Sequence, residues 1–410
     1  MTGVALRVST IVAITVALAM IIAREGSTHS AWLWVAGVVL VASAAVFELA
    51  TKRGRGRQSA LSVLIGLGSV GVGIGIAPAW LTKAGLGTTS IAGIVALAGG
   101  LTLLALAYLD VGTSLGRLGK LLSGFGLVLL VVFTALTLSV AVAATNVPPT
   151  DIGETPAMRG LDHIDVELVT EDGVVLDAWY TPSRNGANVV LLHGSGSTRS
   201  SVLDQMEVLA ANGYGVLAFD ARGHGRSQGR AMDFGWFGDL DASSAIQWLA
   251  ESPEVAGGSI ALVGMSMGGE QAIGVAASDE RVVAVVAEGA TGRTAADKLW
   301  LPDLYGARGW IQRAIDMVRF GLADALTEAE PPMALRDAVA GIAPRPLLLI
   351  TAGNVVDEEM AARYIQSGSP DTVDVWVVEG ADHTRGLEVS PAEWEERVVG
   401  FLRDAVPIDG

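Results

Sequence analysis

The first 150 residues contain five apolar stretches, each close to the length that a helix needs to cross a bilayer. They lie at residues 4–23, 31–50, 60–82, 90–109 and 121–145, and a spanning helix needs about 20 mostly apolar residues. Because backbone polar groups find no water inside a bilayer, such stretches must be helical. We therefore predict an all-α membrane region at residues 1–145, whose first helix is retained rather than cleaved as a signal peptide.

Basic residues in the loops between these stretches predict the orientation of the region. Cytoplasmic loops of membrane proteins are enriched in lysine and arginine. Two loops of this chain have that character: 51–59, with Lys52, Arg53, Arg55 and Arg57, and 110–120, with Arg117 and Lys120. We expect a multi-pass protein of the cell membrane with a cytoplasmic N-terminus, and five crossings then place the residues after 145 on the extracytoplasmic side.

Both the charge and the sequence pattern change after the last apolar stretch. Residues 1–150 carry nine Lys/Arg and three Asp/Glu, whereas the rest of the chain carries 18 and 40. Such an excess of acidic residues disfavours nucleic-acid binding, because phosphate contacts need positive charge. We predict a linker at residues 146–160 and a single domain at residues 161–410.

The region 161–410 alternates short apolar runs with helical stretches. The predicted strands are 164–170, 174–182, 188–193, 215–220, 259–264, 282–289, 346–351 and 373–380. The predicted helices include 200–212, 239–251, 269–278 and 357–367. Most of the strand runs are continuously apolar, which is typical of strands covered on both faces. This alternation indicates an α/β fold with a mainly parallel sheet flanked by helices.

Three serines lie in the motif G-x-S-x-G, and their structural context separates them. Ser114 lies in a short loop between two membrane stretches, and Ser227 lies seven residues beyond the predicted strand 215–220. Ser266, in GMSMGG, follows the predicted strand 259–264 and precedes a predicted helix. A nucleophile elbow has this strand–serine–helix arrangement, with small residues at the positions that Gly264 and Gly268 occupy here. Ser266 is therefore the candidate nucleophile.

A catalytic serine needs a base, and the base needs an acid that orients it. Of the five histidines, His383 follows the last predicted strand, in the segment GADHTRG. When the elbow serine comes first, the acid falls between the serine and the histidine along the chain. The loop after PLLLIT, with the sequence AGNVVDEEM, offers Asp357, Glu358 and Glu359.

Four blocks, in order along residues 160–405, resemble the α/β-hydrolase superfamily. They are LLHGSG at 191–196, FDARGHGRSQG at 219–229, GMSMGG at 264–269 and GADHT at 380–384. The pattern is most similar to Bem46-like membrane-associated acyl hydrolases and to dienelactone-hydrolase-like proteins. The resemblance implies that Ser266 attacks an acyl carbonyl and that His383 accepts its proton. It also implies an oxyanion hole formed by the backbone N–H groups of Met267 and Ser195.

The resemblance leaves the acid open between two neighbours. The family often places this acid three residues after the glycine that ends the strand. In this chain three uncharged residues separate Gly353 from Asp357, so the first acid comes one position late. We expect Asp357 to orient His383, with Glu358 as the alternative acid.

A further segment, at about residues 290–343, is expected to form a small helical cap, as insertions at this point of the fold commonly do. It contains four large aromatic residues: Trp300, Tyr305, Trp310 and Phe320. Three roles are open for them: lining an acyl pocket, facing the membrane, or packing the cap onto the sheet.

We therefore predict a membrane-anchored serine hydrolase, carboxylesterase- or lipase-like, that cleaves an ester or thioester through an acyl-enzyme. Two alternatives stand beside it: a serine peptidase of the same fold, and a catalytically silent hydrolase-fold sensor or binding module. A transporter is disfavoured, because the apolar stretches contain almost no ionisable residue apart from Glu48. We expect no metal and no cofactor. The expected partners are a small acyl substrate, lipid-derived compounds included, and the lipid bilayer.

Overall fold

The computed structural model describes residues 2–24, 29–50, 55–252, 255 and 258–406, and the chain divides into two compact units. The first unit comprises Met1–Pro148 together with Ile315–Leu326. The second comprises Pro149–Ala314 together with Thr327–Gly410. Part of the expected cap therefore belongs to the same compact unit as the N-terminal helices.

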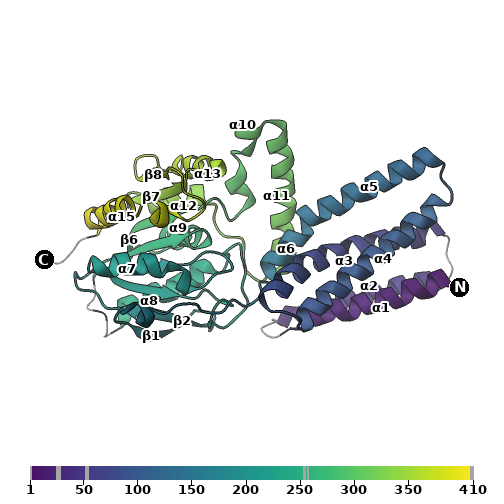
Figure 1. Ribbon diagram of the computed structural model, residues 1–410, viewed down its shortest axis with the longest axis horizontal. Coiled ribbons are helices and arrows are strands. Elements are labelled where there is room, and N and C mark those ends of the chain that lie inside the picture. Colours follow the sequence, from purple (N-terminus) through teal and green to yellow (C-terminus); the bar gives the residue numbers. More distant parts are fainter. Residues whose placement is uncertain (1, 25–28, 51–54, 253–254, 256–257, 407–410) are drawn as a thin grey trace. The chain divides into compact units, whose positions relative to one another are not determined.

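The first unit is helical throughout its described elements (Figure 1). Its helices are α1 (Thr2–Ile22), α2 (His29–Ala50), α3 (Arg55–Lys83), α4 (Thr88–Gly112), α5 (Arg117–Leu136) and α6 (Leu138–Thr145). In the described part of the chain, four segments are long and apolar enough to cross a membrane: Gly3–Ile22, Gly56–Lys83, Thr88–Gly112 and Arg117–Thr145. The predicted stretch 31–50 coincides with α2, but the side chains near both its ends lie outside the described residues. Its described apolar part, Trp34–Phe47, is shorter.

Close packing between α3 and α4 depends on small residues. A Cβ atom at Gly73 would lie 2.5 Å from the backbone nitrogen of Leu97 in α4, which is too close for any side chain. Membrane helices, which have no hydrophobic effect to drive them together, commonly associate through such close backbone contacts. The glycine content of this region therefore has a structural role.

The second unit is built on an eight-stranded sheet. Its strands are β1 (Ile164–Val169), β2 (Val175–Thr181), β3 (Asn188–Leu192), β4 (Gly215–Phe219), β5 (Ile260–Met265), β6 (Val282–Glu288), β7 (Leu347–Ala352) and β8 (Val373–Val378). They lie in the order β1-β2-β4-β3-β5-β6-β7-β8. Among the described strands, β2 alone pairs antiparallel, with β1 and β4, and the remaining pairs are parallel. This confirms the predicted α/β fold with a mainly parallel sheet.

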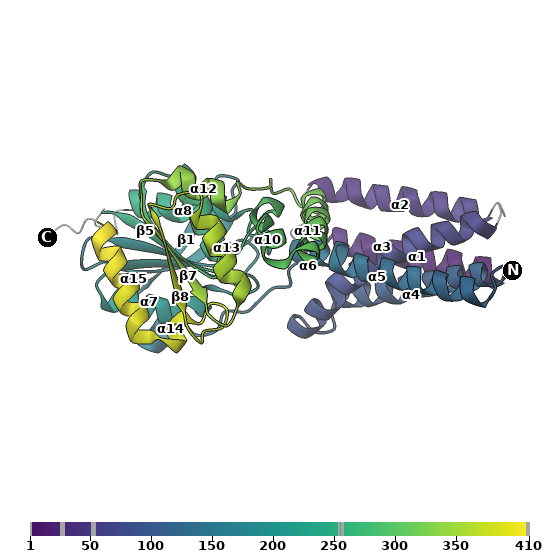
Figure 2. The same ribbon diagram turned by 90° about the horizontal axis from the view of Figure 1, so that it is seen from above.

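Helices cover both faces of this sheet, as Figure 2 shows. One apolar core lies between the sheet and α8 (Gly238–Glu251), α9 (Met267–Ser278), α12 (Leu335–Ile342) and α13 (Val356–Gln366). The other lies between the sheet and α7 (Leu203–Ala211), α14 (Gly386–Val389) and α15 (Pro391–Ala405). Strands β3, β4, β5 and β7 are buried along their whole length. This two-sided burial explains why their sequences are continuously apolar.

The strand order brings the ends of several strands to one edge of the sheet. β3 and β5 pair from Asn188–Ile260 to Leu192–Gly264, so the segment that follows β3 lies beside the end of β5. The segments that follow β5, β7 and β8 begin at the same edge of the sheet, because these strands are parallel. In open parallel sheets, ligands bind at the carboxyl ends of the strands.

Candidate active site

Ser266 lies in a sharp turn between β5 and α9. Its backbone has φ 53° and ψ −119°, a conformation that L-residues rarely adopt and that is typical of a nucleophile elbow. A Cβ atom at Gly264 would lie 2.2 Å from the carbonyl oxygen of Gly268, so the turn excludes a side chain there. The Ser266 N–H donates to the carbonyl oxygen of Glu288 at 2.7 Å, which fixes the turn against β6.

Ser266, His383 and Glu358 form a continuous hydrogen-bonded chain. The Nε2 atom of His383 lies 2.9 Å from the Oγ atom of Ser266. Its Nδ1 atom lies 2.5 Å from Oε1 of Glu358. The Glu358 side chain is buried, and its Oε2 atom accepts a hydrogen bond from the N–H of Ala352 at 2.8 Å. The three side chains are thus brought together from the segments that follow β5, β8 and β7.

Asp357 occupies a different position from the one expected. Its Oδ1 atom accepts a hydrogen bond from the hydroxyl group of Tyr305. Asp357 and Glu358 are consecutive in the first turn of α13, and consecutive helical residues point about 100° apart. Only one of the two can face inward, and that residue is Glu358. The expectation that Asp357 contacts His383 is therefore corrected in favour of the alternative acid.

Negative charge around His383 favours the protonated imidazole. The hydrogen bond with Glu358 is the main cause that raises the pKa of His383, and the charges of Glu358, Glu270 and Glu288 add to it. Partial burial acts in the opposite direction. This is the electrostatic arrangement that stabilises an imidazolium formed during proton transfer.

Two of these carboxylates, Glu270 and Glu288, were not singled out by the sequence analysis. Oε1 of Glu270 accepts hydrogen bonds from the N–H groups of Thr291 and Gly292, at 3.1 and 2.8 Å. Glu288 is buried at the end of β6, and burial raises the pKa of its carboxyl group. The signals that could have found them are an acid one turn after the elbow serine and an acid that ends a buried strand.

Glu288 connects β6 to the segment that follows His383. Its Oε1 atom accepts from the N–H of Gly386 at 2.7 Å, and its Oε2 atom accepts from Nε1 of Trp394 at 3.0 Å. The same residue accepts the Ser266 N–H through its backbone carbonyl. One residue therefore holds both the nucleophile turn and the histidine loop.

The segment His193–Ser195 lies beside the nucleophile. A Cβ atom at Gly194 would lie 3.3 Å from the Cβ atom of Ser266. The Gly194 carbonyl oxygen accepts a hydrogen bond from the hydroxyl of Ser197 at 2.8 Å, and Ser195, the expected oxyanion donor, is exposed. Met267 is the first residue of α9, and an N–H at that position has no partner within its own helix.

His193 has a structural position beneath this segment. Its Nε2 atom accepts the N–H of Ala221 at 3.0 Å, and its Nδ1 atom lies 2.7 Å from the Gly194 carbonyl oxygen. Burial, followed by the nearby His224, lowers the pKa of His193 to about 3. The ring is therefore neutral at physiological pH, with its proton on Nδ1, and it fixes the loop without acting as a base.

The hydroxyl groups of the other two G-x-S-x-G serines are hydrogen-bonded to groups other than His383. The hydroxyl group of Ser114 donates to the carbonyl oxygen of Val111 at 2.9 Å. That of Ser227 donates to the carbonyl oxygen of Asp220 at 2.6 Å and accepts from the N–H of Asp177 at 2.9 Å. Within the described ranges, no group of three or more His, Cys, Asp and Glu residues could hold a metal ion.

Known proteins share this architecture. The family described as serine aminopeptidase, S33, matches residues 183–335. A solved esterase of Pyrococcus furiosus is similar over 63% of this chain and 97% of its own, with a TM-score of 0.52 and 26% sequence identity. The second unit has the α/β-hydrolase fold. The sheet order, the serine turn and these similarities agree on this assignment.

Curated relatives match only part of the chain. An uncharacterized protein of Mycobacterium tuberculosis is 35% identical over 115 residues, which are 27% of this chain and 40% of that protein. A polyketide transferase of Penicillium sp. is 32% identical over 136 residues, which are 31% of this chain and 45% of that protein. The chain thus spans less than half the length of these relatives.

The raised pKa of His383 predicts the acid limb of the pH profile. A histidine base must be neutral to accept the serine proton, so activity is lost as the pH falls through its pKa. Because this pKa is raised, we expect the midpoint of the acid limb in kcat/KM above about 6.5, the ordinary pKa of histidine. Steady-state hydrolysis of a non-ionising ester between pH 5 and 9 measures it, and a midpoint below 6.5 contradicts the prediction.

Proposed function

We propose that this protein is a membrane-anchored serine hydrolase that cleaves an ester or thioester through Ser266, His383 and Glu358. The observation that carries the proposal is the chain of hydrogen bonds from Ser266 Oγ to His383 Nε2, at 2.9 Å, and from His383 Nδ1 to Glu358, at 2.5 Å. This is the arrangement by which a hydroxyl group is activated as a nucleophile.

In the first half of the reaction, Ser266 Oγ attacks the acyl carbonyl carbon while its proton moves to Nε2 of His383. Glu358 stabilises the resulting imidazolium and remains ionised. The backbone N–H groups of Met267 and Ser195 are assigned to the oxyanion, because one begins α9 and the other lies in the loop beside Ser266. Collapse of the tetrahedral intermediate releases the alcohol or thiol with the proton from His383, and leaves an acyl-serine.

In the second half, water replaces the leaving group. His383 accepts a proton from the water as the water attacks the acyl-serine carbonyl. The second tetrahedral intermediate then expels Ser266 Oγ, which recovers its proton from His383. The products are a carboxylic acid and free enzyme, so no cofactor is consumed.

Membrane anchoring by the N-terminal helices forms the second half of the proposal. The four long apolar segments support it, because each has the length and composition that a spanning helix needs. The distribution of lysine and arginine in the loops favours a cytoplasmic N-terminus and an extracytoplasmic hydrolase domain. This location would give the enzyme access to acyl compounds of the membrane or the cell envelope.

A serine peptidase is the second candidate, and one observation favours it. The matching family is described as a serine aminopeptidase, and the same three side chains would serve amide hydrolysis. The similarity to an esterase structure over nearly its whole length favours the ester reaction. The two activities differ in the leaving group, an alcohol or thiol in one and an amine in the other, and the triad itself does not select between them.

The test is hydrolysis by the full-length protein purified in detergent. We expect p-nitrophenyl acyl esters to be hydrolysed with an initial burst of p-nitrophenol of about one per enzyme, the kinetic signature of an accumulating acyl-enzyme. Aminoacyl p-nitroanilides serve as the amide counterparts. Faster cleavage of the anilides would transfer the assignment to the peptidase, and a folded protein without activity on either class would favour a silent binding module.

A further inference from the structure

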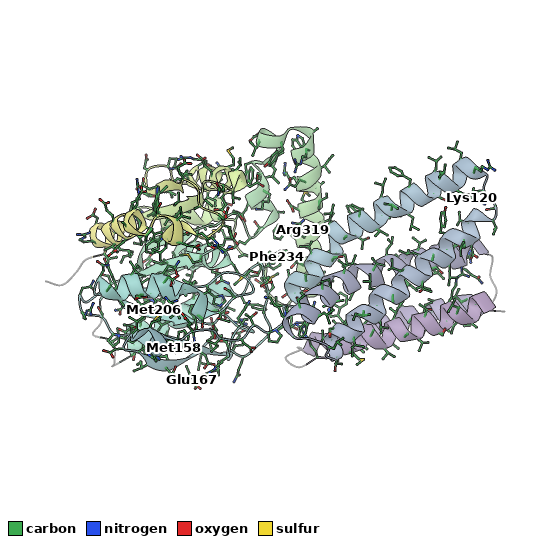
Figure 3. The ribbon with its side chains drawn as sticks, in the orientation of Figure 1. Lys120, Met158, Glu167, Met206, Phe234 and Arg319 are labelled. Atoms are coloured by element: carbon green, nitrogen blue, oxygen red, sulfur yellow. The ribbon has the colours of Figure 1, made fainter. Side chains whose placement is uncertain are left out.

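Helix α11 (Ala307–Leu326) contains a segment that packs with the N-terminal helices, because Ile315–Leu326 belongs to their compact unit. Figure 3 labels Arg319 on this segment. Its guanidinium group donates from Nη2 and Nε to the carbonyl oxygen of Leu136, at 3.3 and 3.4 Å. Leu136 is the last residue of α5, so Arg319 satisfies a carbonyl that the end of a helix leaves without an intrahelical partner.

This contact places the C-terminal half of α11 near one end of the apolar segments. The apolar segment that contains Leu136 ends at Thr145, after the eight-residue helix α6. Eight helical residues span about 12 Å, so Leu136 lies about this far from the end of the segment. Leu326 packs against a cluster that includes Ile21 and Val142, close to the ends of α1 and α6. Trp80, in the same cluster, donates from Nε1 to the carbonyl oxygen of Asn146 at 2.7 Å, and tryptophan is enriched where a bilayer meets water.

One face of α11 is apolar and exposed. The exposed fractions are 60% for Trp310, 64% for Ile311, 60% for Met317 and 40% for Val318. Ala314, Gly321 and Ala325 are exposed as well. At about 100° per residue these positions fall on a single stripe of the helix, which we name the α11 stripe. By contrast, Trp300 and Phe320 are buried, so packing accounts for those two aromatic residues of the cap.

Arginines lie on both sides of the α11 stripe. From the helical period, Arg308 falls beyond one edge of the stripe, and Arg313 falls beyond the other, on the same side as the exposed Asp324. The guanidinium group of Arg313 lies 5.2 Å from the ring centroid of Trp310, and that of Arg308 lies 5.1 Å from the ring of Tyr305. An exposed apolar face bordered by arginine and carrying tryptophan is the pattern of helices that lie in the surface of an anionic membrane.

We propose that the α11 stripe lies in the interface of the lipid bilayer, with its arginines at the level of the lipid phosphates. Val132, Phe133 and Leu136 of α5 are exposed apolar residues, and the Arg319–Leu136 contact joins α11 to the end of that surface. Lipid that covers α5 therefore comes close to α11, whose stripe lies on a different face from Arg319. This inference rests on the membrane anchoring proposed above.

The absence of cysteine from the sequence makes the test direct. Single-cysteine variants Ile311→Cys and Met317→Cys carry a nitroxide label, in vesicles of phosphatidylcholine and phosphatidylglycerol. Leu129→Cys, on an exposed site of α5, is the lipid-facing control. Met158→Cys, an exposed methionine of the hydrolase unit, is the aqueous control matched to Met317. Collisions with oxygen, which concentrates in lipid, and with a water-soluble nickel chelate are measured by electron paramagnetic resonance.

The expected result is a several-fold higher oxygen-to-nickel collision ratio at positions 311 and 317 than at 158. Values at 311 and 317 equal to that at 158, with a high ratio at 129, would overturn the inference and leave the anchoring intact. Low collision rates with both reagents at 311 and 317 would also overturn it, since protein, such as a second copy, would then cover the stripe. A low ratio at 129 would remove the anchoring and the inference together.

Discussion

The variant Ser266→Ala is expected to lose hydrolysis by a factor on the order of 10⁶, the loss seen when the serine of a triad is removed. The alanine lacks the oxygen that would form the acyl-enzyme, while the proposed oxyanion donors, which are backbone N–H groups, are retained. Labelling by a fluorophosphonate, which requires an activated serine, should disappear in the same variant. In-gel fluorescence of membranes that contain wild type or variant measures the effect.

Ser114→Ala is the matched control, because it removes a serine from the same pentapeptide pattern. The hydroxyl of Ser114 bonds only locally, to Val111, so this variant should label like the wild type. Ser227→Ala should also keep its label, although the loss of the hydrogen bonds to Asp220 and Asp177 should lower the free energy of unfolding by about 1 kcal/mol. Equal labelling of wild type and Ser266→Ala would show that a different serine is activated.

The fold and the positions of Ser266 and His383 could be predicted from the sequence, because each depends on a local pattern. A buried parallel strand is apolar at every position, so strands such as β5 are visible as uninterrupted runs. A serine directly after such a run, with glycine two positions before it and two positions after it, specifies the elbow at Ser266. His383 follows the last strand. Because the segments after parallel strands lie at the same edge of the sheet, a residue at this position can reach Ser266.

Three further features could not be predicted, because they depend on contacts between residues that are not visible in the sequence pattern. The contact made by Glu358 rather than Asp357 depends on where α13 begins, and a shift of one residue turns the inward position by about 100°. Glu270 and Glu288 influence His383 through space, from α9 and β6. The assignment of Ile315–Leu326 to the unit of the N-terminal helices depends on packing between segments more than 170 residues apart, such as Leu136 and Arg319.

The variant Glu358→Gln is expected to lower kcat on the order of 10⁴-fold, as replacement of a triad acid by its amide does. The amide keeps the shape of the side chain but supplies no negative charge to the imidazolium. Depending on its orientation, it can also favour the wrong tautomer of His383. The side chain is buried and its second oxygen accepts from the N–H of Ala352, a bond that the amide oxygen can make only by turning the NH₂ group toward His383.

Asp357→Asn is the matched control for this substitution, one position earlier in the same helical turn. It weakens the hydrogen bond with Tyr305, which joins α13 to the cap, and should change kcat by only a few-fold. The pH profile separates an orienting acid from a residue that only supports the fold. Loss of the Glu358 charge removes the main cause of the raised His383 pKa, so the acid limb should move to lower pH in Glu358→Gln and stay in place in Asp357→Asn.

Glu358→Asp completes the series, because it restores the charge on a side chain one methylene shorter. We expect it to recover part of the rate lost in Glu358→Gln and to return the acid limb toward its wild-type position. If Asp357→Asn instead caused the larger loss and shifted the limb, the acid would be Asp357 and α13 would have to turn when substrate binds. The two neighbouring carboxylates therefore provide an internal comparison in which only the residue that contacts His383 can move both the rate and the pH profile.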